Sequence, residues 1–193
     1  MKYFRTLLVL ALLFILAGCG PIIGQLMRMS EGIKDFTVVS GNLGTVKPGM
    51  DIVVVGPFDL KEGAYSIARG DEAVILADKL KRHHLFDTEI YFLRKYGTLT
   101  KDIMEMKSES AAKLQKRLGR DGGLPDLILF GTIVSRDTIV APTRGLITEV
   151  KFLLDFYDPA QKSSVVVEIT VRDLFRDYID TVIEELQNRM KAK

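Results

Sequence analysis

Two continuous apolar runs constrain the fold of this chain more than any other feature. Residues 52–55 read Ile-Val-Val-Val, all of them β-branched, and residues 126–134 read Asp-Leu-Ile-Leu-Phe-Gly-Thr-Ile-Val. Neither run alternates between apolar and polar side chains, and this pattern is typical of strands that are covered on both faces of a sheet. We therefore expect two central strands.

Four further strands are predicted from shorter apolar or alternating stretches, over residues 36–39, 88–93, 149–157 and 163–171. The last two flank the sequence Asp158-Pro159-Ala160-Gln161-Lys162, which is typical of the turn of a hairpin. The first central strand is expected to end at Gly56-Pro57-Phe58, because Pro57 has no N–H to donate to a neighbouring strand.

Helices are predicted over residues 71–81, 109–118 and 173–190, with a short helix near residues 103–106. Asp71 and Ser108 are placed to cap the first two, and Gly119 to end the second. The last carries an apolar stripe made of Phe175, Tyr178, Ile179, Val182, Leu186 and Met190. We expect an α/β or α+β fold, in which helices pack on a single mixed β-sheet and the chain closes with a hairpin and a helix.

The first twenty residues resemble a bacterial lipoprotein signal peptide. Lys2 and Arg5 precede an apolar run over residues 7–16, and a lipobox follows, made of Leu16, Ala17, Gly18 and Cys19. The apolar run is shorter than the roughly 20 residues that span a bilayer, so cleavage before Cys19 is expected rather than a retained transmembrane helix. The Cys19 thiol is then the site of lipid attachment.

This signal divides the chain into a signal peptide over residues 1–18, a lipidated N-terminus and short tether over 19–35, and a periplasmic domain over 36–193. Cys19 is the only cysteine, so no disulfide can form within the chain. By resemblance to enterobacterial sorting, Gly20 in the second position of the mature chain favours the outer membrane. The tether is too short to cross to the cell wall, so the domain should lie close to the membrane.

Charge and motifs exclude several functional classes. Removal of residues 1–18 takes Lys2 and Arg5 from a total of 27 basic and 25 acidic residues, so the mature chain is formally neutral and a nucleic-acid partner is not expected. A Gly-x-Ser-x-Gly elbow, a free cysteine nucleophile and metal-binding histidine spacing are all missing, so we expect no enzyme activity, cofactor or metal.

Two short motifs are interpreted as structural rather than functional. His83 and His84 follow one another at the end of a predicted helix, where they would point in different directions and where cations favour the helix dipole. The loop over residues 119–123 follows a helix and lacks a Gly-Lys-Ser/Thr ending, so we interpret it as a turn and not as a phosphate site.

Several stretches together resemble the periplasmic domain of the curli secretion channel family, over about residues 51–190. They are Val53-Val54-Val55-Gly56-Pro57-Phe58, the helix from Ala111-Ala112 to Leu118-Gly119, residues 126–133, and the closing hairpin and helix. The same layout occurs in the TolB amino-terminal domain and in lipoproteins that activate peptidoglycan synthases. The resemblance implies a scaffold, adaptor or channel, a possible homo-oligomer, and no catalytic residue.

The chain departs from the curli channel pattern where that family has membrane-spanning hairpins. Segments 94–107 and 136–148 are too short for two strands of about 9–11 residues each, and Pro142 is expected to disrupt pairing in the second. We therefore expect attachment through the lipid alone and an adaptor or assembly role with another envelope protein. The alternative is a structural subunit of a multimeric export complex.

Overall fold

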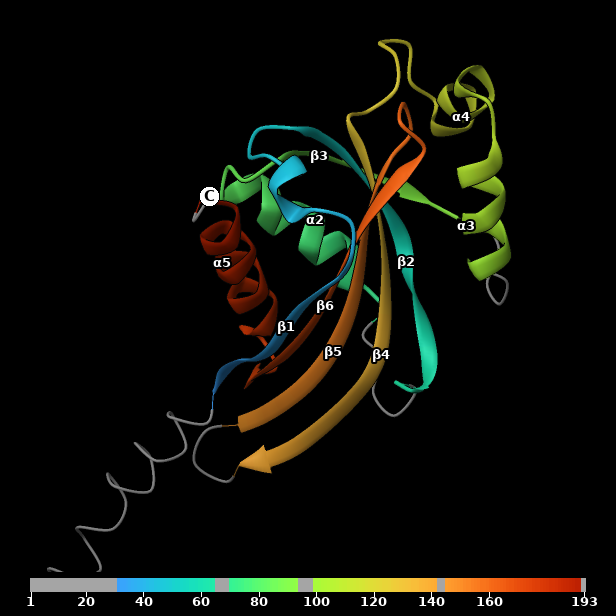
Figure 1. The fold of residues 1–193 in the computed structure, drawn as a ribbon. Helices are drawn as coiled ribbons and strands as arrows, with labels where there is room; N and C mark the ends of the chain where they lie inside the picture. Colours follow the sequence, from blue (N-terminus) through green and yellow to red (C-terminus); the bar gives the residue numbers. More distant parts are fainter. Residues whose placement is uncertain (1–30, 65–69, 94–98, 142–144, 192–193) are drawn as a thin grey trace, which may run out of the picture. The chain divides into compact units, whose positions relative to one another are not determined.

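The computed structural model describes residues 31–64, 70–93, 99–141 and 145–191, and those from Gly32 onward belong to one compact unit, Gly32–Lys193 (Figure 1). The lipobox residues Leu16, Ala17, Gly18 and Cys19 lie outside the described part of the chain.

The core of the domain is a six-stranded mixed sheet with the strand order β1-β6-β5-β4-β2-β3, which confirms the predicted fold class. β2 pairs in parallel with β3 and with β4, and the remaining pairs are antiparallel. The strands span Gly32–Ser40 (β1), Asp51–Gly63 (β2), Asp87–Phe92 (β3), Leu127–Ala141 (β4), Gly145–Asp158 (β5) and Ser163–Leu174 (β6). The two apolar runs lie in β2 and β4, which have neighbours on both sides.

Helices lie on both faces of the sheet, and this explains the continuous apolar runs. α2 (Glu72–Arg82) and α5 (Tyr178–Lys191) cover one face, and α3 (Leu99–Ser108) and α4 (Ala111–Leu118) lie on the other (Figure 1). Ile52 and Val54 belong to the larger core cluster under α2 and α5, whereas Val55 packs in a smaller cluster with Met106 and Leu114 of α3 and α4. A short 3-10 helix, Leu43–Thr45, connects β1 to β2.

β2 continues past Pro57, so the predicted end of this strand at residues 56–58 is wrong. The parallel pairing with β4 is regular up to Val55, shifts register, and resumes at Asp59. The irregularity places Pro57 outside the ladder, so its missing N–H leaves no unpaired position in the sheet.

The Phe58 ring lies directly over Gly131 of β4. A Cβ atom built on Gly131 would lie 2.5 Å from two ring carbons of Phe58, closer than any real contact. Both residues are buried. Phe58 within β2 and Gly131 within β4 therefore form one packing contact.

The helices of the second face begin at other residues than predicted. α3 ends at Ser108, and α4 begins at Ala111 after Ser110, so the expectation that Ser108 caps a helix from Glu109 is wrong. The buried Glu109 instead accepts ion pairs from Lys113 and Arg117, both at 3.2 Å. These ion pairs compensate the buried negative charge of Glu109, which lies between the end of α3 and the start of α4.

β4 and β5 form a longer hairpin than the sequence indicated. Their antiparallel pairing continues to Ala141 and Gly145, so the expectation that Pro142 disrupts pairing over residues 136–148 is wrong for the described part of that segment. Residues 142–144 fall between the two strands, outside the described ranges. The β-branched sequence Thr138-Ile139-Val140 favours an extended chain up to this point.

α5 begins at Tyr178 rather than at residue 173, because β6 extends to Leu174. The Phe175 N–H then donates to the Leu146 carbonyl at 2.9 Å, which continues the pairing with β5. The predicted apolar stripe is present, and its buried helical members are Tyr178, Ile179, Val182, Ile183 and Leu186.

A buried ion pair joins β4 to α2 at the base of the long hairpin. The Arg136 guanidinium contacts the Glu72 carboxylate, and the two side chains are 0% and 3% exposed. Glu72 lies in the first turn of α2, where the helix dipole favours an anion. The pair fixes the position of β4 relative to α2.

Candidate functional site: the groove beside the edge strand

The structure places the sequence-predicted candidates at separate positions. His83 follows the last residue of α2, and its Nε2 lies 3.6 Å from Asp180 Oδ1 on α5. Lys79 Nζ contacts the other carboxylate oxygen, Asp180 Oδ2, at 2.5 Å. His84 has a positive φ of 51°. Within the described ranges, no three His, Cys, Asp or Glu side chains are grouped as metal ligands. No helix in those ranges is long and apolar enough to cross a membrane.

The turn after α4 is confirmed as a structural feature. Gly119 takes the left-handed conformation, with φ 68°, that ends the helix. Arg120 then pairs with Asp51 at 2.5 Å and with Glu89 at 3.1 Å, at the amino-terminal ends of β2 and β3. This loop therefore attaches α4 to the sheet.

A polar cluster that the sequence did not indicate attaches α3 to the same face. Lys107 pairs with Asp155, donates to Ser164 Oγ at 3.0 Å, and lies 5.1 Å from the ring centre of Tyr157. The Tyr157 hydroxyl donates to the Lys107 carbonyl at 2.9 Å. Burial, followed by the negative charges of Asp158 and Asp155, raises the pKa of Tyr157. These contacts join α3 to β5 and β6 and hold the helix on the sheet.

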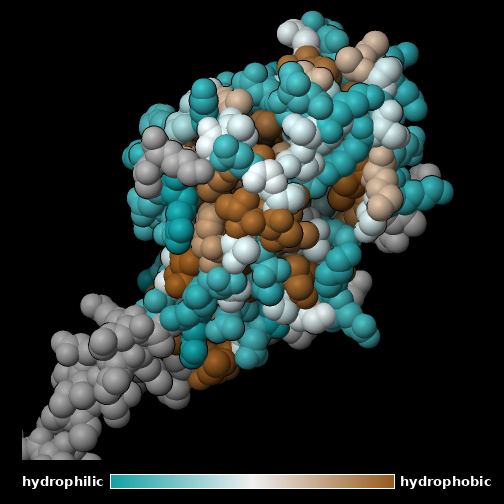
Figure 2. Space-filling view, in the orientation of Figure 1, coloured by the Kyte–Doolittle hydropathy of each residue, from teal (hydrophilic) through white to brown (hydrophobic). Residues whose placement is uncertain are grey.

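The candidate interaction surface lies at the other edge of the sheet, along β1. β1 pairs only with β6, so its outer edge is unpaired by any described strand. Register shifts between Ile33 and Asp35 and between Val38 and Ser40 leave a regular ladder only over residues 35–38. Val38 and Val39 are exposed, and hydrophobic atoms gather over this end of β1 in Figure 2.

A groove of about 590 Å³ runs between β1 and α5. The lining residues are Ile33, Lys34, Asp35, Phe36, Thr181, Glu184, Glu185, Asn188 and Arg189. The Arg189 guanidinium lies 4.8 Å from the centre of the Phe36 ring, and its Nε donates to Glu185 Oε1 at 2.8 Å. Arg189 is thus held in place by a cation–π contact and an ion pair.

The chemistry of this groove suits the binding of a polar or charged segment. Its lining combines two cations and three carboxylates with one aromatic ring, and none of the lining residues is Ser, Cys or His. Ion pairs and hydrogen bonds are available to a bound segment, and β1 offers backbone groups beside them. Sequence reasoning missed this site, because the pairing of β1 with a helix about 150 residues later has no local pattern.

Comparisons with known proteins find similarity to solved structures but not to any family model. No family model matches the sequence, and no curated protein matches it. A dodecamer of a PelC variant from Paraburkholderia phytofirmans superposes with a TM-score of 0.47 at 14% identity, over 81% of this chain and 94% of that chain. A second PelC dodecamer from that organism gives a TM-score of 0.45 at 13% identity, over 81% and 93%. The resemblance to the curli channel group therefore remains a prediction.

Proposed function

We propose that this protein is a lipid-anchored lipoprotein that acts as a non-catalytic adaptor or assembly factor for another component of the cell envelope. Lipid on Cys19 holds it in the outer membrane, with the domain on the periplasmic side. The lipobox over residues 16–19 supports the anchor. The observation that carries the adaptor role is the unpaired edge of β1 beside the charged groove.

Binding at this edge would use the backbone of β1 and the side chains of α5. An extended segment of a partner can pair with the outer edge of β1 over residues 35–38 and add a strand to the sheet. Alternate side chains of that segment would then face the groove. Because Glu184 and Glu185 contribute carboxylates there, a segment with a cationic side chain fits it best.

A second candidate function is a subunit of a multimeric envelope complex. β3 is the opposite edge of the sheet, and it exposes Ile90 and Phe92. A contact between the β1 edge of one copy and the β3 edge of the next would be heterologous, and such contacts generate rings when the rotation closes.

Site-specific photo-crosslinking in the native bacterium separates these functions. A photoreactive amino acid at Val39, beside the free edge, should give a discrete adduct with another envelope protein if the adaptor role is right. An adduct with a second copy of this chain would favour the multimeric subunit. The same probe at Met104, which is exposed on α3, is the matched control. Identical patterns at both positions, or no adduct at Val39, would contradict a binding role for the β1 edge.

A further inference from the structure

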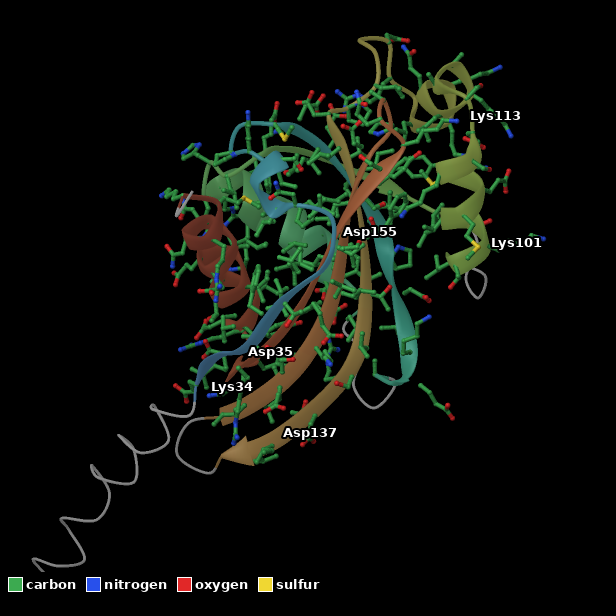
Figure 3. The ribbon with its side chains drawn as sticks, viewed as in Figure 1. Lys34, Asp35, Lys101, Lys113, Asp137 and Asp155 are labelled. Carbon is green, nitrogen blue, oxygen red and sulfur yellow. The ribbon has the colours of Figure 1, made fainter. Side chains whose placement is uncertain are left out.

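The end of the β4–β5 hairpin projects beyond the point where the chain enters the sheet. In the register of the sheet, Gly32 lies opposite Arg172, Arg172 opposite Glu149, and Glu149 opposite Asp137. The hairpin continues for four more pairs, from Thr138–Thr148 to Ala141–Gly145. At a rise of about 3.3 Å per residue the hairpin extends about 13 Å past Gly32. β6 runs beside β5 for the first two of these pairs, up to Leu174 opposite Ile147. Figure 3 shows Asp137 at the same end of the sheet as Lys34 and Asp35 of β1.

This projection, residues 138–141 and 145–148, is here named the hairpin tip, and it is apolar on both faces. Ile139 lies opposite Ile147 on one face, and Val140 lies opposite Leu146 on the other. Ile139, Val140 and Leu146 are 48%, 72% and 42% exposed, whereas Ile147 and Thr148 are buried. Hydrophobic atoms are visible at this end of the molecule, where β4 ends (Figure 2). A sheet that packs on protein with one face needs apolar residues on that face alone, so the pattern indicates an apolar medium around the tip.

The threonine hydroxyls of the hairpin tip are satisfied within it. The hydroxyls of Thr138 and Thr148 lie 3.2 Å apart in a hydrogen bond, and Thr148 Oγ1 also contacts the Asp137 carbonyl at 3.1 Å. Ladder pairing of the backbone continues to Ala141 and Gly145. The hydroxyls and the backbone groups that face the partner strand are therefore paired and can enter an apolar medium without the cost of an unsatisfied donor or acceptor. The outer edge of β4 has no described strand partner beyond Ser135, so its backbone groups require the hydrated headgroup layer.

A charged row marks where the apolar tip begins. Asp137 and Glu149 are exposed cross-strand partners, and Arg172 of β6 lies opposite Glu149 in the register of the sheet. Next to the tip, Leu146, Leu174 and Phe175 line a groove of about 300 Å³ together with Arg176. The Arg176 side chain is 82% exposed, and a long cationic side chain at such a boundary can reach lipid phosphate.

The number of residues between Cys19 and Gly32 limits how far the domain can lie from the proposed lipid anchor. Residues 20–31 connect the lipobox cysteine to Gly32. A fully extended chain of this length spans about 45 Å. In the proposed function the anchor therefore keeps Gly32 within about this distance of the bilayer, and the hairpin tip extends past Gly32 at the same end of the sheet.

We infer that the hairpin tip inserts its apolar side chains into the membrane leaflet that holds the lipid anchor. This inference rests on the proposed lipid anchoring and extends it, since the sequence indicated attachment through the lipid alone. The tip does not cross the bilayer, because a spanning strand needs about 9–11 residues and each strand of the tip supplies four. Insertion orients the domain, so that the β1 edge and its groove are presented at a fixed angle to the membrane.

Tryptophan fluorescence of the full lipoprotein in vesicles tests the insertion, because the natural chain contains no tryptophan. Val140→Trp places the reporter in the tip, and Val39→Trp places it at an exposed valine near the other end of β1 as the matched control. The vesicles are made of phosphatidylethanolamine and phosphatidylglycerol, with or without bromine on the acyl chains. We expect the emission of the Val140→Trp protein to shift to the blue in vesicles and to be quenched by the brominated lipid, and the emission of the Val39→Trp protein not to be quenched.

Flotation of the same vesicles reports on the anchor independently of the tip. If the Val140→Trp protein floats with the lipid while its emission is not quenched, the insertion is overturned and the anchor remains intact. A blue shift of this emission without quenching would also overturn the insertion, and would indicate that another copy of the chain covers the tip. Protein that does not float would overturn both proposals.

Discussion

At the scale of single residues, the sheet is held by contacts between residues that are far apart in the sequence. Phe58 packs on Gly131, and Glu72 is buried against Arg136. Both contacts attach β4 to the β2–α2 segment, and both lie along the strand that forms the projecting hairpin. Changes at these positions should therefore report on the integrity of β4.

Gly131→Ala should destabilise the domain, because its new Cβ would overlap the Phe58 ring at 2.5 Å. Overpacking of a buried site of this kind costs about 1–3 kcal/mol of the free energy of unfolding. Urea denaturation followed by circular dichroism measures the loss. Gly122→Ala is the matched control, since a Cβ at Gly122 has no neighbour within 4 Å, and its effect should stay within about 0.5 kcal/mol.

The double variant Phe58→Leu, Gly131→Ala tests the cause of that loss. A smaller side chain at Phe58 makes room for the new methyl group, so the double variant should lose less than the sum of the two single variants. Strictly additive losses would show that the ring of Phe58 does not oppose a side chain at position 131.

Tyr157 should make the stability of the domain fall in alkaline solution. Its pKa is raised above 10.0 in the folded chain, by burial first and then by Asp158 and Asp155, so the unfolded chain ionises at lower pH. The free energy of unfolding contributed by this group is constant below about pH 10 and falls as the pH rises through the folded pKa. Tyr157→Phe should show a shallower decline in denaturation series from pH 8 to 11. Equal slopes for both proteins would contradict the assignment.

At the scale of elements, α5 contacts elements from both the beginning and the end of the domain. It packs on β6, contacts α2 through Asp180 and Lys79, and lines the groove with β1. The helix is therefore required for the fold and also forms one wall of the candidate binding site. A change on its buried face and a change on its groove face should have different effects.

Leu186→Ala should cost about 2–5 kcal/mol of stability, because Leu186 is fully buried in the main core and the neighbouring backbone cannot close the cavity. Thermal or urea unfolding measures the loss. Glu184→Ala on the exposed groove face of the same helix should change stability by no more than about 0.5 kcal/mol and should instead weaken partner binding. A small loss for Leu186→Ala would show that α5 is only loosely attached to the sheet.

At the scale of the whole molecule, the sheet has distinct regions for distinct contacts. One face is covered by α2 and α5, the end of β1 with α5 forms the groove, and the hairpin tip projects at the end where the chain enters. In the proposed function these regions serve stability, partner binding and membrane contact. In the same proposal, partner binding and membrane contact both require the lipid anchor, since the anchor brings the domain to the membrane.

Cys19→Ala should abolish lipid attachment and leave an uncleaved precursor or a mislocalised protein, because in the proposed lipoprotein the thiol is the group that takes the lipid. Fractionation of the native bacterium, with the size of the protein judged on a gel, measures both effects. Gly20→Ala, next to the cysteine, is the control and should mature normally. Normal maturation and normal outer-membrane fractionation of the Cys19→Ala protein would disprove the lipoprotein proposal.

The sequence by itself determined which elements exist and which of their faces are buried. The apolar runs over residues 52–55 and 126–134, the stripe of α5 and the glycine at the end of α4 are local patterns, and local patterns follow the periods of strands and helices. The fold class could therefore be predicted, together with the hairpin of β5 and β6.

Only the tertiary structure decided where strands end, which residues meet, and which surfaces remain free. Pro57 does not end β2, because a register shift places it outside the ladder with β4. The β4–β5 hairpin is longer than the sequence predicted, because the two strands pair with each other up to Ala141 and Gly145. Phe58 and Gly131 are 73 positions apart in the sequence. The residues of β1 and α5 that line the groove are about 150 positions apart. Pairing and packing of this kind depend on the whole chain, and no window of the sequence contains both partners.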